Sequence, residues 1–382
     1  MSKFIYMDNA ATTAVRQEVV DAMVPYFTES YANPSSVYSF AQKTKNDMEE
    51  ARETIASILG AAKPNEIYFT GGGSESDNWA LKATADAYAS KGKHIITSTI
   101  EHHAILHTCA YLEKKGFEIT YVNVDENGKV KLDELEAAIR PDTILISIMT
   151  ANNEIGTIQP VREIGRIAHE HGVLFHTDAV QAYMHLRINV HDMAISMLSA
   201  SAHKFGGPKG VGFLYIRKDQ PIRAFMHGGS QERHMRSGTE NVPGIAGMGK
   251  AVELGMKHGK EEAAYVKKMR NDTIKKLFRE IPYLRLNGDF HHRLPGNINI
   301  SFQFVEAQSL LVLLDMQGIC ASAGSACTSG DKGISHVLQA IHLREDLARG
   351  TLRFTLGADN TPEEMEELVK QLKLLVNDLR SF

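Results

Sequence analysis

The chain has 382 residues, of which 43% are hydrophobic and 23% charged, and its formal net charge at pH 7 is -4. This composition is typical of a globular protein long enough for two domains, and it gives no electrostatic reason to expect a nucleic acid or a membrane as partner. Three cysteines do not suit a disulfide framework, and the sequence contains no signal peptide and no apolar run of about 18 residues. A cytoplasmic location is therefore expected.

Regular structure is predicted to begin with helices, because apolar residues recur at helical spacing over 15–27 and 37–59. Strand and helix signals then alternate. Strands are predicted at 66–70, 94–98, 118–122, 143–149, 173–177, 197–200 and 211–216. Helices are predicted at 74–89, 103–115, 132–139 and 161–171. The alternation predicts an α/β fold with a large, mostly parallel mixed sheet and helices on both of its faces.

The alternation of strand and helix signals ends after residue 248. A long, charged helical stretch at 250–280 is followed by apolar segments at 297–302, 307–316, 319–322 and 352–356, and by a final helix at 363–379. This pattern predicts a smaller α+β domain. We expect the larger domain to span 15–248 and the smaller one to combine 1–14 with 249–382.

Lys204 lies in a turn rich in glycine and proline, residues 200–210, between two predicted strands. A lysine held where buried strands end can be desolvated, and it then serves as a Schiff-base nucleophile and proton carrier. Asp178 follows the preceding predicted strand, at the carboxyl edge where open α/β sheets bind ligands. An acid and a lysine so placed are what pyridoxal 5'-phosphate (PLP) requires. Taken singly, Asp178 is also compatible with a helix N-cap, and Lys204 with a solvated surface lysine.

Other polar groups follow neighbouring strands. Residues 70–77 carry three glycines before a helix, a turn that suits an anion but matches neither standard nucleotide-binding motif. His102 can stack on an aromatic cofactor or move protons, and Asn153 can donate to a cofactor or form an Asx-turn. Arg353 lies within an apolar strand. This position suits recognition of a carboxylate, and an ordinary ion pair is the alternative. His103 and His107 share a helical face, but no third ligand accompanies them, so no metal site is predicted.

Residues 322–333 form a run of small residues that contains Cys327. So little apolar surface predicts a flexible loop, and a thiol on such a loop beside a PLP site suggests a nucleophile. Cys109 and Cys320 lie in apolar surroundings and fit the usual role of a buried cysteine.

Several of these segments occur in an order that resembles a known family. They are residues 8–13, 33–36, 70–77, 101–102, 152–156, 176–181, 201–210, 227–239 and 322–329. Together they resemble the PLP-dependent cysteine desulfurases of the nitrogen-fixation and iron–sulfur-assembly type, within the fold-type I aminotransferase superfamily. The resemblance covers essentially the whole chain, and residues 322–329 (SAGSACTS) indicate the class with a long mobile loop.

The resemblance implies conversion of L-cysteine to L-alanine, with transfer of the sulfur as a persulfide on Cys327. Lys204 matches the Schiff-base lysine, Asp178 the partner of the pyridine nitrogen, and His102 the stacked imidazole that is also the candidate for proton transfer. The remaining matches contact the ring hydroxyl (Gln181, Asn153), the phosphate (Gly73, Ser74, Ser201, His203, and Thr239 from a second subunit) and the substrate carboxylate (Arg353, Asn33, Asn153).

The same resemblance implies a homodimer with shared active sites and a protein that accepts the sulfur, either an iron–sulfur scaffold or a tRNA-thiolation enzyme. It assigns no resident metal, and it leaves open that Cys327 is a transient iron–sulfur ligand. The alternatives are a selenocysteine lyase, an aminotransferase or a non-catalytic sulfur-relay scaffold.

Three departures bear on the acceptor and the cofactor. Position 74 is Ser where the family often has Thr, residues 330–334 differ from the Leu-Glu-Pro-like stretch of assembly enzymes, and no C-terminal extension follows Phe382. We expect the first change to keep the hydroxyl, and the other two to leave the acceptor open.

Overall fold

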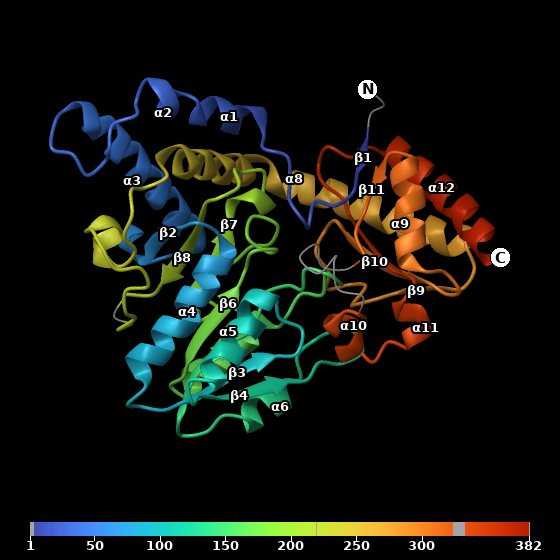
Figure 1. The fold of residues 1–382 in the computed structure, drawn as a ribbon, viewed down its shortest axis with the longest axis horizontal. Coiled ribbons are helices and arrows are strands. Elements are labelled where there is room, and N and C mark those ends of the chain that lie inside the picture. Colours follow the sequence, from blue (N-terminus) through green and yellow to red (C-terminus); the bar gives the residue numbers. More distant parts are fainter. Residues whose placement is uncertain (1–3, 219, 324–332, 382) are drawn as a thin grey trace.

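The computed structural model describes residues 4–218, 220–323 and 333–381. A large sheet and a group of smaller sheets lie at opposite ends of the molecule, and α8 (Val242–Glu280) runs from one to the other (Figure 1). Within the described residues, no helix has the combined length and apolarity that crossing a bilayer demands.

The large sheet contains seven strands in the order β2-β8-β7-β6-β5-β3-β4. They are β2 (Ile67–Thr70), β3 (His94–Ser98), β4 (Glu118–Val122), β5 (Thr143–Ser147), β6 (Leu174–Asp178), β7 (Met197–Ser201) and β8 (Gly212–Ile216). β8 is antiparallel to its two neighbours, and the other pairs are parallel. The prediction of a mostly parallel mixed sheet is therefore confirmed.

Both faces of this sheet are buried because each strand is apolar on both sides. Successive residues enter different cores: Ile95 and Leu145 belong to one hydrophobic cluster, and Ile96 and Ile146 to the other. α4 (Gly73–Tyr88) and α5 (His103–Glu113) cover the first face. α3 (Phe40–Leu59), α7 (Val161–Glu170) and the first half of α8 cover the second. The strands of a parallel sheet that is buried on both faces appear in the sequence as continuous apolar runs.

A third cluster forms the core of the smaller end of the molecule. There β10 (Asn297–Phe302) pairs antiparallel with β12 (Thr351–Thr355) and β9 (Leu284–Leu286). β1 (Ile5–Tyr6) pairs with β11 (Ile319–Cys320), and α9 (Ala307–Met316) and α12 (Pro362–Arg380) pack outside. The division proposed at residue 248 falls inside α8, and the two-domain boundaries stay a prediction.

Several element bounds differ from those expected. The predicted helix 15–27 is two helices, α1 (Gln17–Met23) and α2 (Pro25–Thr28), because Pro25 has no N–H to continue α1. α8 begins eight residues before the predicted start at 250, where the Asn241 side chain accepts from the Gly244 amide and caps it. Four elements were not predicted because they are too short to show a hydrophobic period: β1, β9, α10 (His336–Ala340) and α11 (Glu345–Ala348).

A buried ion pair fastens residues 227–239 to the large sheet. The Arg52 guanidinium on α3 donates to both carboxylate oxygens of Glu232, at 2.7 and 2.8 Å, and also to the Ile67 carbonyl. Glu232 and the next two residues have positive φ values of 44°, 59° and 65°, which L-residues rarely adopt. The ion pair therefore offsets local backbone strain.

We predict that Glu232→Gln lowers the free energy of unfolding by about 3 kcal/mol, because it removes the buried counter-charge of Arg52 and leaves only the more exposed Glu49 to pair with it. Urea denaturation measures the loss. Glu345→Gln is the matched control, since Glu345 pairs with Arg349 on the surface and such pairs contribute about 0–1 kcal/mol. Equal losses in the two variants would contradict the argument.

Candidate active site

The predicted cofactor residues gather at one edge of the large sheet. Asp178 ends β6, Lys204 ends the 3-10 turn Ala202–Lys204 after β7, and Asn153 follows β5. His102 is the N-cap of α5, after β3. This is the carboxyl edge of the parallel strands, where ligands bind in open α/β sheets.

Asp178 is 6% exposed, and its Oδ1 accepts a hydrogen bond from the Val180 amide at 2.8 Å. Burial raises its pKa to about 6, and the Val180 amide and the Lys204 charge limit the rise. A carboxylate held in this way is stabilised by a cationic ring nitrogen beside it, because the two charges offset each other's desolvation.

Lys204 is held by the N-terminal segment. Its Nζ donates to the Ala10 carbonyl at 2.6 Å and to the Ala11 carbonyl at 2.8 Å. Gln181 donates from Nε2 to the same Ala10 carbonyl at 2.9 Å. The amine therefore sits at the junction of residues 8–13 with the large sheet.

His102 is largely enclosed, and its Nδ1 accepts from the Ala104 amide at 3.1 Å. Burial lowers its pKa to about 4, and the nearby charge of Lys204 lowers it further. The imidazole is therefore neutral at pH 7, with the proton on Nε2, so that the ring can stack on an aromatic group and exchange a proton there.

An anion cradle lies between α4 and β7. Gly72 has a φ of +147°, and a side chain on Gly73, the first residue of α4, would collide with Val180 at 2.5 Å. The backbone therefore approaches the turn after β6 closely, and a Cβ on Gly72 would lie 3.6 Å from the Ser201 hydroxyl at the end of β7, so this hydroxyl lies near the free amides of the helix N-terminus. Ser74 stands beside Gly73 at the start of α4. This arrangement fits the predicted phosphate contacts.

His203 lies on the same turn as Lys204, and its Nδ1 is 3.1 Å from the Thr12 hydroxyl. Burial lowers its pKa to about 4, with a further contribution from the Lys204 charge. The ring is therefore neutral at pH 7 and offers an anion a hydrogen bond and no net charge.

Arg353 comes from β12, in the smaller end of the molecule, and is 1% exposed. Its two terminal nitrogens donate to Asp8 Oδ1 at 2.8 Å and to the Asn153 carbonyl at 3.0 Å. Its Nε is buried without a hydrogen-bond partner in the described residues. An unsatisfied guanidinium N–H favours an acceptor such as a carboxylate.

Two of the predicted site residues described, Asn33 and Thr239, do not join this group. Asn33 is exposed, and its Oδ1 accepts from the Ser35 amide, so in the described residues it forms no hydrogen bond to Arg353. Thr239 is also exposed and forms no hydrogen bond to the other site residues described. Cys327 and most of the segment 322–333 lie outside the described residues.

The sequence analysis missed a set of buried acids behind the site. Asp77 on α4 is 1% exposed, and burial together with the Asp178 charge raises its pKa well above the usual value. Glu101 accepts from the Ser98 hydroxyl and the Met149 amide, and burial raises its pKa to about 8. A signal existed for Asp77, because it shares helical spacing with Ala80 and Leu81 in the apolar stripe of α4.

The other two cysteines differ in burial: Cys109 is buried, as expected, and Cys320 is only half-buried. Cys109 is fully buried on α5, and burial raises its pKa to about 12. Burial also raises the pKa of Cys320. Both thiols are therefore poor nucleophiles near pH 7. Among the described residues, no group of three or more potential ligands is arranged to hold a metal ion.

The aminotransferase class-V family model matches residues 5–368, so the chain belongs to this family, whose members depend on PLP. The sequence is 53% identical to the cysteine desulfurase IscS of Methanosarcina thermophila over 100% of this chain and 94% of that protein. It is 50% identical to the cysteine desulfurase IscS of Dictyoglomus turgidum, over 100% and 97% of the two chains.

Solved structures are similar over nearly the whole chain. A NifS-like protein superposes with a TM-score of 0.93 at 39% identity and covers 98% of this chain and 100% of its own. The structure of SspA in complex with cysteine has a TM-score of 0.83 at 39% identity and covers 94% of this chain and 100% of its own. The expected fold-type I architecture is therefore confirmed.

We predict that His102 in the cofactor-free protein titrates near pH 4, because burial and the Lys204 charge disfavour the imidazolium. NMR of selectively labelled histidines measures the pKa, and His102→Gln assigns the resonance. A His102 resonance that titrates near the ordinary value of about 6.5 would contradict this description of the site.

Proposed function

We propose that this chain is a PLP-dependent cysteine desulfurase, which converts L-cysteine to L-alanine and passes the sulfur on as a persulfide. The observation that carries the proposal is the grouping of Lys204, Asp178 and His102 at one sheet edge. Identity of 50–53% to proteins named cysteine desulfurase, over the full chain, supports it independently.

The residues present fit PLP. Asp178 would hold the pyridine nitrogen, Lys204 the aldehyde carbon and His102 the face of the ring, while Gln181 and Asn153 would contact the ring hydroxyl. The cradle of Gly73, Ser74, Ser201 and His203 would hold the phosphate. When bound, PLP withdraws electrons from the substrate α-carbon and so makes the α-proton acidic.

The protein's own groups bind the substrate and move its protons. The buried Arg353 would bind the cysteine carboxylate, as its unsatisfied Nε favours, and Asn153 would assist. The Lys204 amine would take the α-proton and return it, since it lies near His102 and Asp178 at the same sheet edge. His102, whose Nδ1 is engaged by the Ala104 amide, would donate its Nε2 proton as the sulfur departs.

Cys327 is the proposed sulfur acceptor within the chain. Its thiolate would attack the substrate sulfur, the carbon–sulfur bond would break, and the electron pair would stay with the carbon skeleton, which becomes alanine on protonation. The sulfur remains on Cys327 as a persulfide. Cys109 and Cys320 suit this role poorly, because burial raises both of their pKa values.

We predict that Lys204→Ala abolishes alanine formation, because it removes both the anchor of the aldehyde and the α-proton base. Cys327→Ser should keep the yellow cofactor absorbance and lose persulfide formation, at least about a hundredfold. Alanine analysis and persulfide trapping measure the two steps. Cys320→Ser is the matched control and should retain both activities.

Wild-type sulfide release from Cys327→Ser in the presence of a thiol reductant would refute the role of Cys327. A protein that stays colourless after incubation with PLP would refute the proposed function itself.

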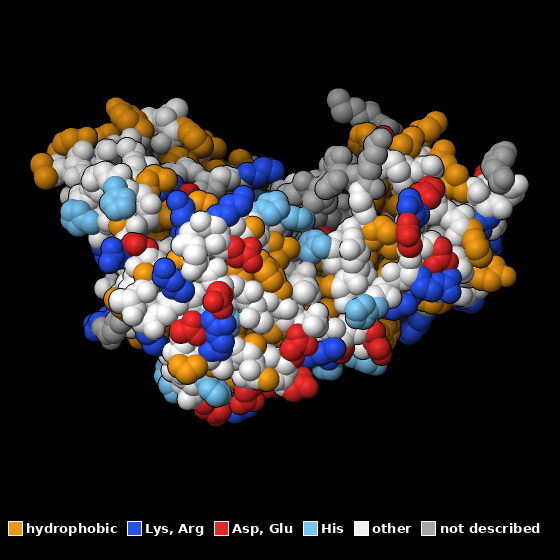
Figure 2. Space-filling view, turned by 60° about the horizontal axis from the view of Figure 1, so that its bottom comes forward, with side chains coloured by type: hydrophobic (Ala, Val, Ile, Leu, Met, Phe, Trp, Pro, Cys, Tyr) orange, Lys and Arg blue, Asp and Glu red, His pale blue; other side chains and the backbone are white. Residues whose placement is uncertain are grey.

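A homodimer with shared sites is part of this proposal. Large hydrophobic side chains gather on residues 20–40, at the α1–α3 end of the molecule (Figure 2). Val37 is 97% exposed, Tyr31 67% and Phe27 63%. Such a patch on a single chain supports burial against a second copy. The exposed Thr239 is then available to the phosphate cradle of the partner.

We predict that Phe27→Asp combined with Val37→Asp weakens dimerisation at least about tenfold, because two charges would enter an apolar interface. Sedimentation equilibrium gives the dissociation constant. Leu374→Asp is the control, since Leu374 is 52% exposed on α12, away from the patch. A wild-type protein that stays monomeric at micromolar concentration would overturn the proposed dimer.

The destination of the sulfur is proposed by family membership alone, as a protein that builds iron–sulfur clusters or thiolates tRNA. A cytoplasmic location belongs to the same proposal. Persulfide trapping on Cys327, followed by incubation with candidate acceptors, distinguishes these destinations.

A further inference from the structure

A cavity of about 460 Å³ lies beside α8, between the large sheet and the smaller end of the molecule. This volume is in the range of small-molecule sites. Of the predicted site residues described, only Gln181 and Lys204 line it, and His102, Asp178 and Arg353 do not. The cavity therefore adjoins the candidate site at Lys204, and most of its lining has no role in the proposed chemistry.

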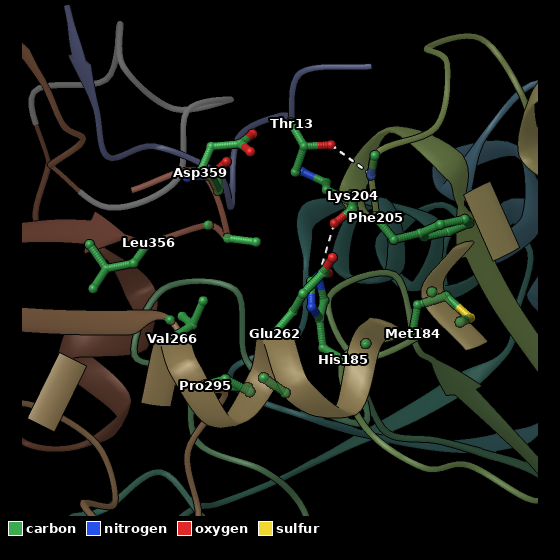
Figure 3. A pocket seen from close by; sticks show the side chains of 18 of the residues that line it. Thr13, Met184, His185, Lys204, Phe205, Glu262, Val266, Pro295, Leu356 and Asp359 are labelled. Carbon is green, nitrogen blue, oxygen red and sulfur yellow. Dashed lines mark hydrogen bonds between the residues drawn. The ribbon is translucent and has the colours of Figure 1, made fainter. Parts of the chain in front are cut away.

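Apolar and polar side chains share the walls of the cavity. Met184, Phe205, Val266 and Leu356 form much of the wall, and they come from both ends of the molecule (Figure 3). Apolar walls with a few convergent polar groups are typical of ligand sites.

The charges that line the cavity are mainly negative. Arg16 is neutralised by Glu262 through two hydrogen bonds of 2.8 and 2.6 Å. The Lys204 ammonium donates to backbone carbonyls. Asp359 is exposed and forms no hydrogen bond or ion pair in the described residues, and Glu18 adds a further negative charge at the rim. An occupant with a positive charge is therefore favoured.

His185 adds a hydrogen-bond acceptor. Its Nε2 donates to the Lys204 carbonyl at 3.0 Å, which leaves Nδ1 with a free lone pair. Solvent reaches the His185 ring through the cavity. Protein atoms nevertheless surround the ring closely, and the resulting desolvation lowers its pKa. The ring is therefore neutral. Both groups that lack a partner, His185 Nδ1 and Asp359, are acceptors, so a donor-rich occupant would satisfy them.

Glycines on α8 help to keep the space open. Gly255 and Gly259 lie one turn apart in the helix and both line the cavity. A Cβ on Gly259 would have the Met184 carbonyl oxygen as its nearest neighbour, at 3.5 Å, an ordinary contact. The packing of α8 therefore does not require glycine at position 259, although glycine makes a helix less stable.

We propose that this cavity binds a small organic cation that carries several N–H donors on an apolar body, such as an arylamidine or arylguanidine. The cation would lie against Asp359 and His185, and the apolar body against Met184, Phe205 and Val266. The proposal does not depend on the desulfurase reaction.

Benzamidine is a suitable probe, because its amidinium does not condense with the aldehyde of PLP as a primary amine would. Isothermal titration of the PLP-loaded protein should show saturable binding of one benzamidine per chain. The neutral benzamide and the anionic benzoate have nearly the same shape and should bind at least about tenfold more weakly.

Two variants test the location. Asp359→Asn should weaken benzamidine binding about tenfold, and Gly259→Leu should abolish it by filling the cavity. Asp378→Asn, which removes an exposed acid outside the cavity lining, should leave binding unchanged. Circular dichroism checks that each variant is folded.

Unchanged binding in Asp359→Asn and Gly259→Leu would overturn the proposal, as would equal binding of benzoate or the absence of saturable binding at millimolar benzamidine. None of these outcomes bears on the desulfurase proposal, which stands or falls with alanine formation.

Discussion

The hydrogen bonds of residues 8–13 hold the two halves of the candidate site together. Asp8 pairs with Arg353 on β12, and the Ala10 amide donates to the Thr355 hydroxyl on the same strand. The Ala10 carbonyl in turn accepts from Lys204 and Gln181, which belong to the large sheet. The groups proposed for substrate and for cofactor come from regions far apart in sequence, and this short segment fixes their separation.

Burial governs the charge states in the site. The same desolvation that keeps His102 and His203 neutral raises the pKa values of Asp77, Glu101 and Asp178. Neutral imidazoles, and carboxyl groups with raised pKa values, suit a site that must receive a ligand with an anionic phosphate and a basic ring. A cationic ring nitrogen beside Asp178 would offset the cost of burying that carboxylate.

The sequence predicted the sheet, its helices and the position of Asp178 and Lys204 at one edge, because strand ends can be located from apolar runs. It did not reveal that Asn33 and Thr239 are exposed and form no hydrogen bond to the other site residues described. Nor did it reveal that Asp77 is buried, because an acidic residue on a helix is usually at the surface. Nor does periodicity reveal that Asp8 meets Arg353, since 345 residues separate them. Long-range pairing of this kind is set by topology.

α8 is continuous over 39 residues, and its two halves belong to different hydrophobic cores. At 1.5 Å per residue it is roughly 58 Å long. No pliable connector joins the two ends of the molecule along this path, so any change in their relative tilt must bend a hydrogen-bonded rod. Relative motion of the two ends along this path is therefore limited to small-amplitude bending of α8, unlike free rotation about a flexible linker.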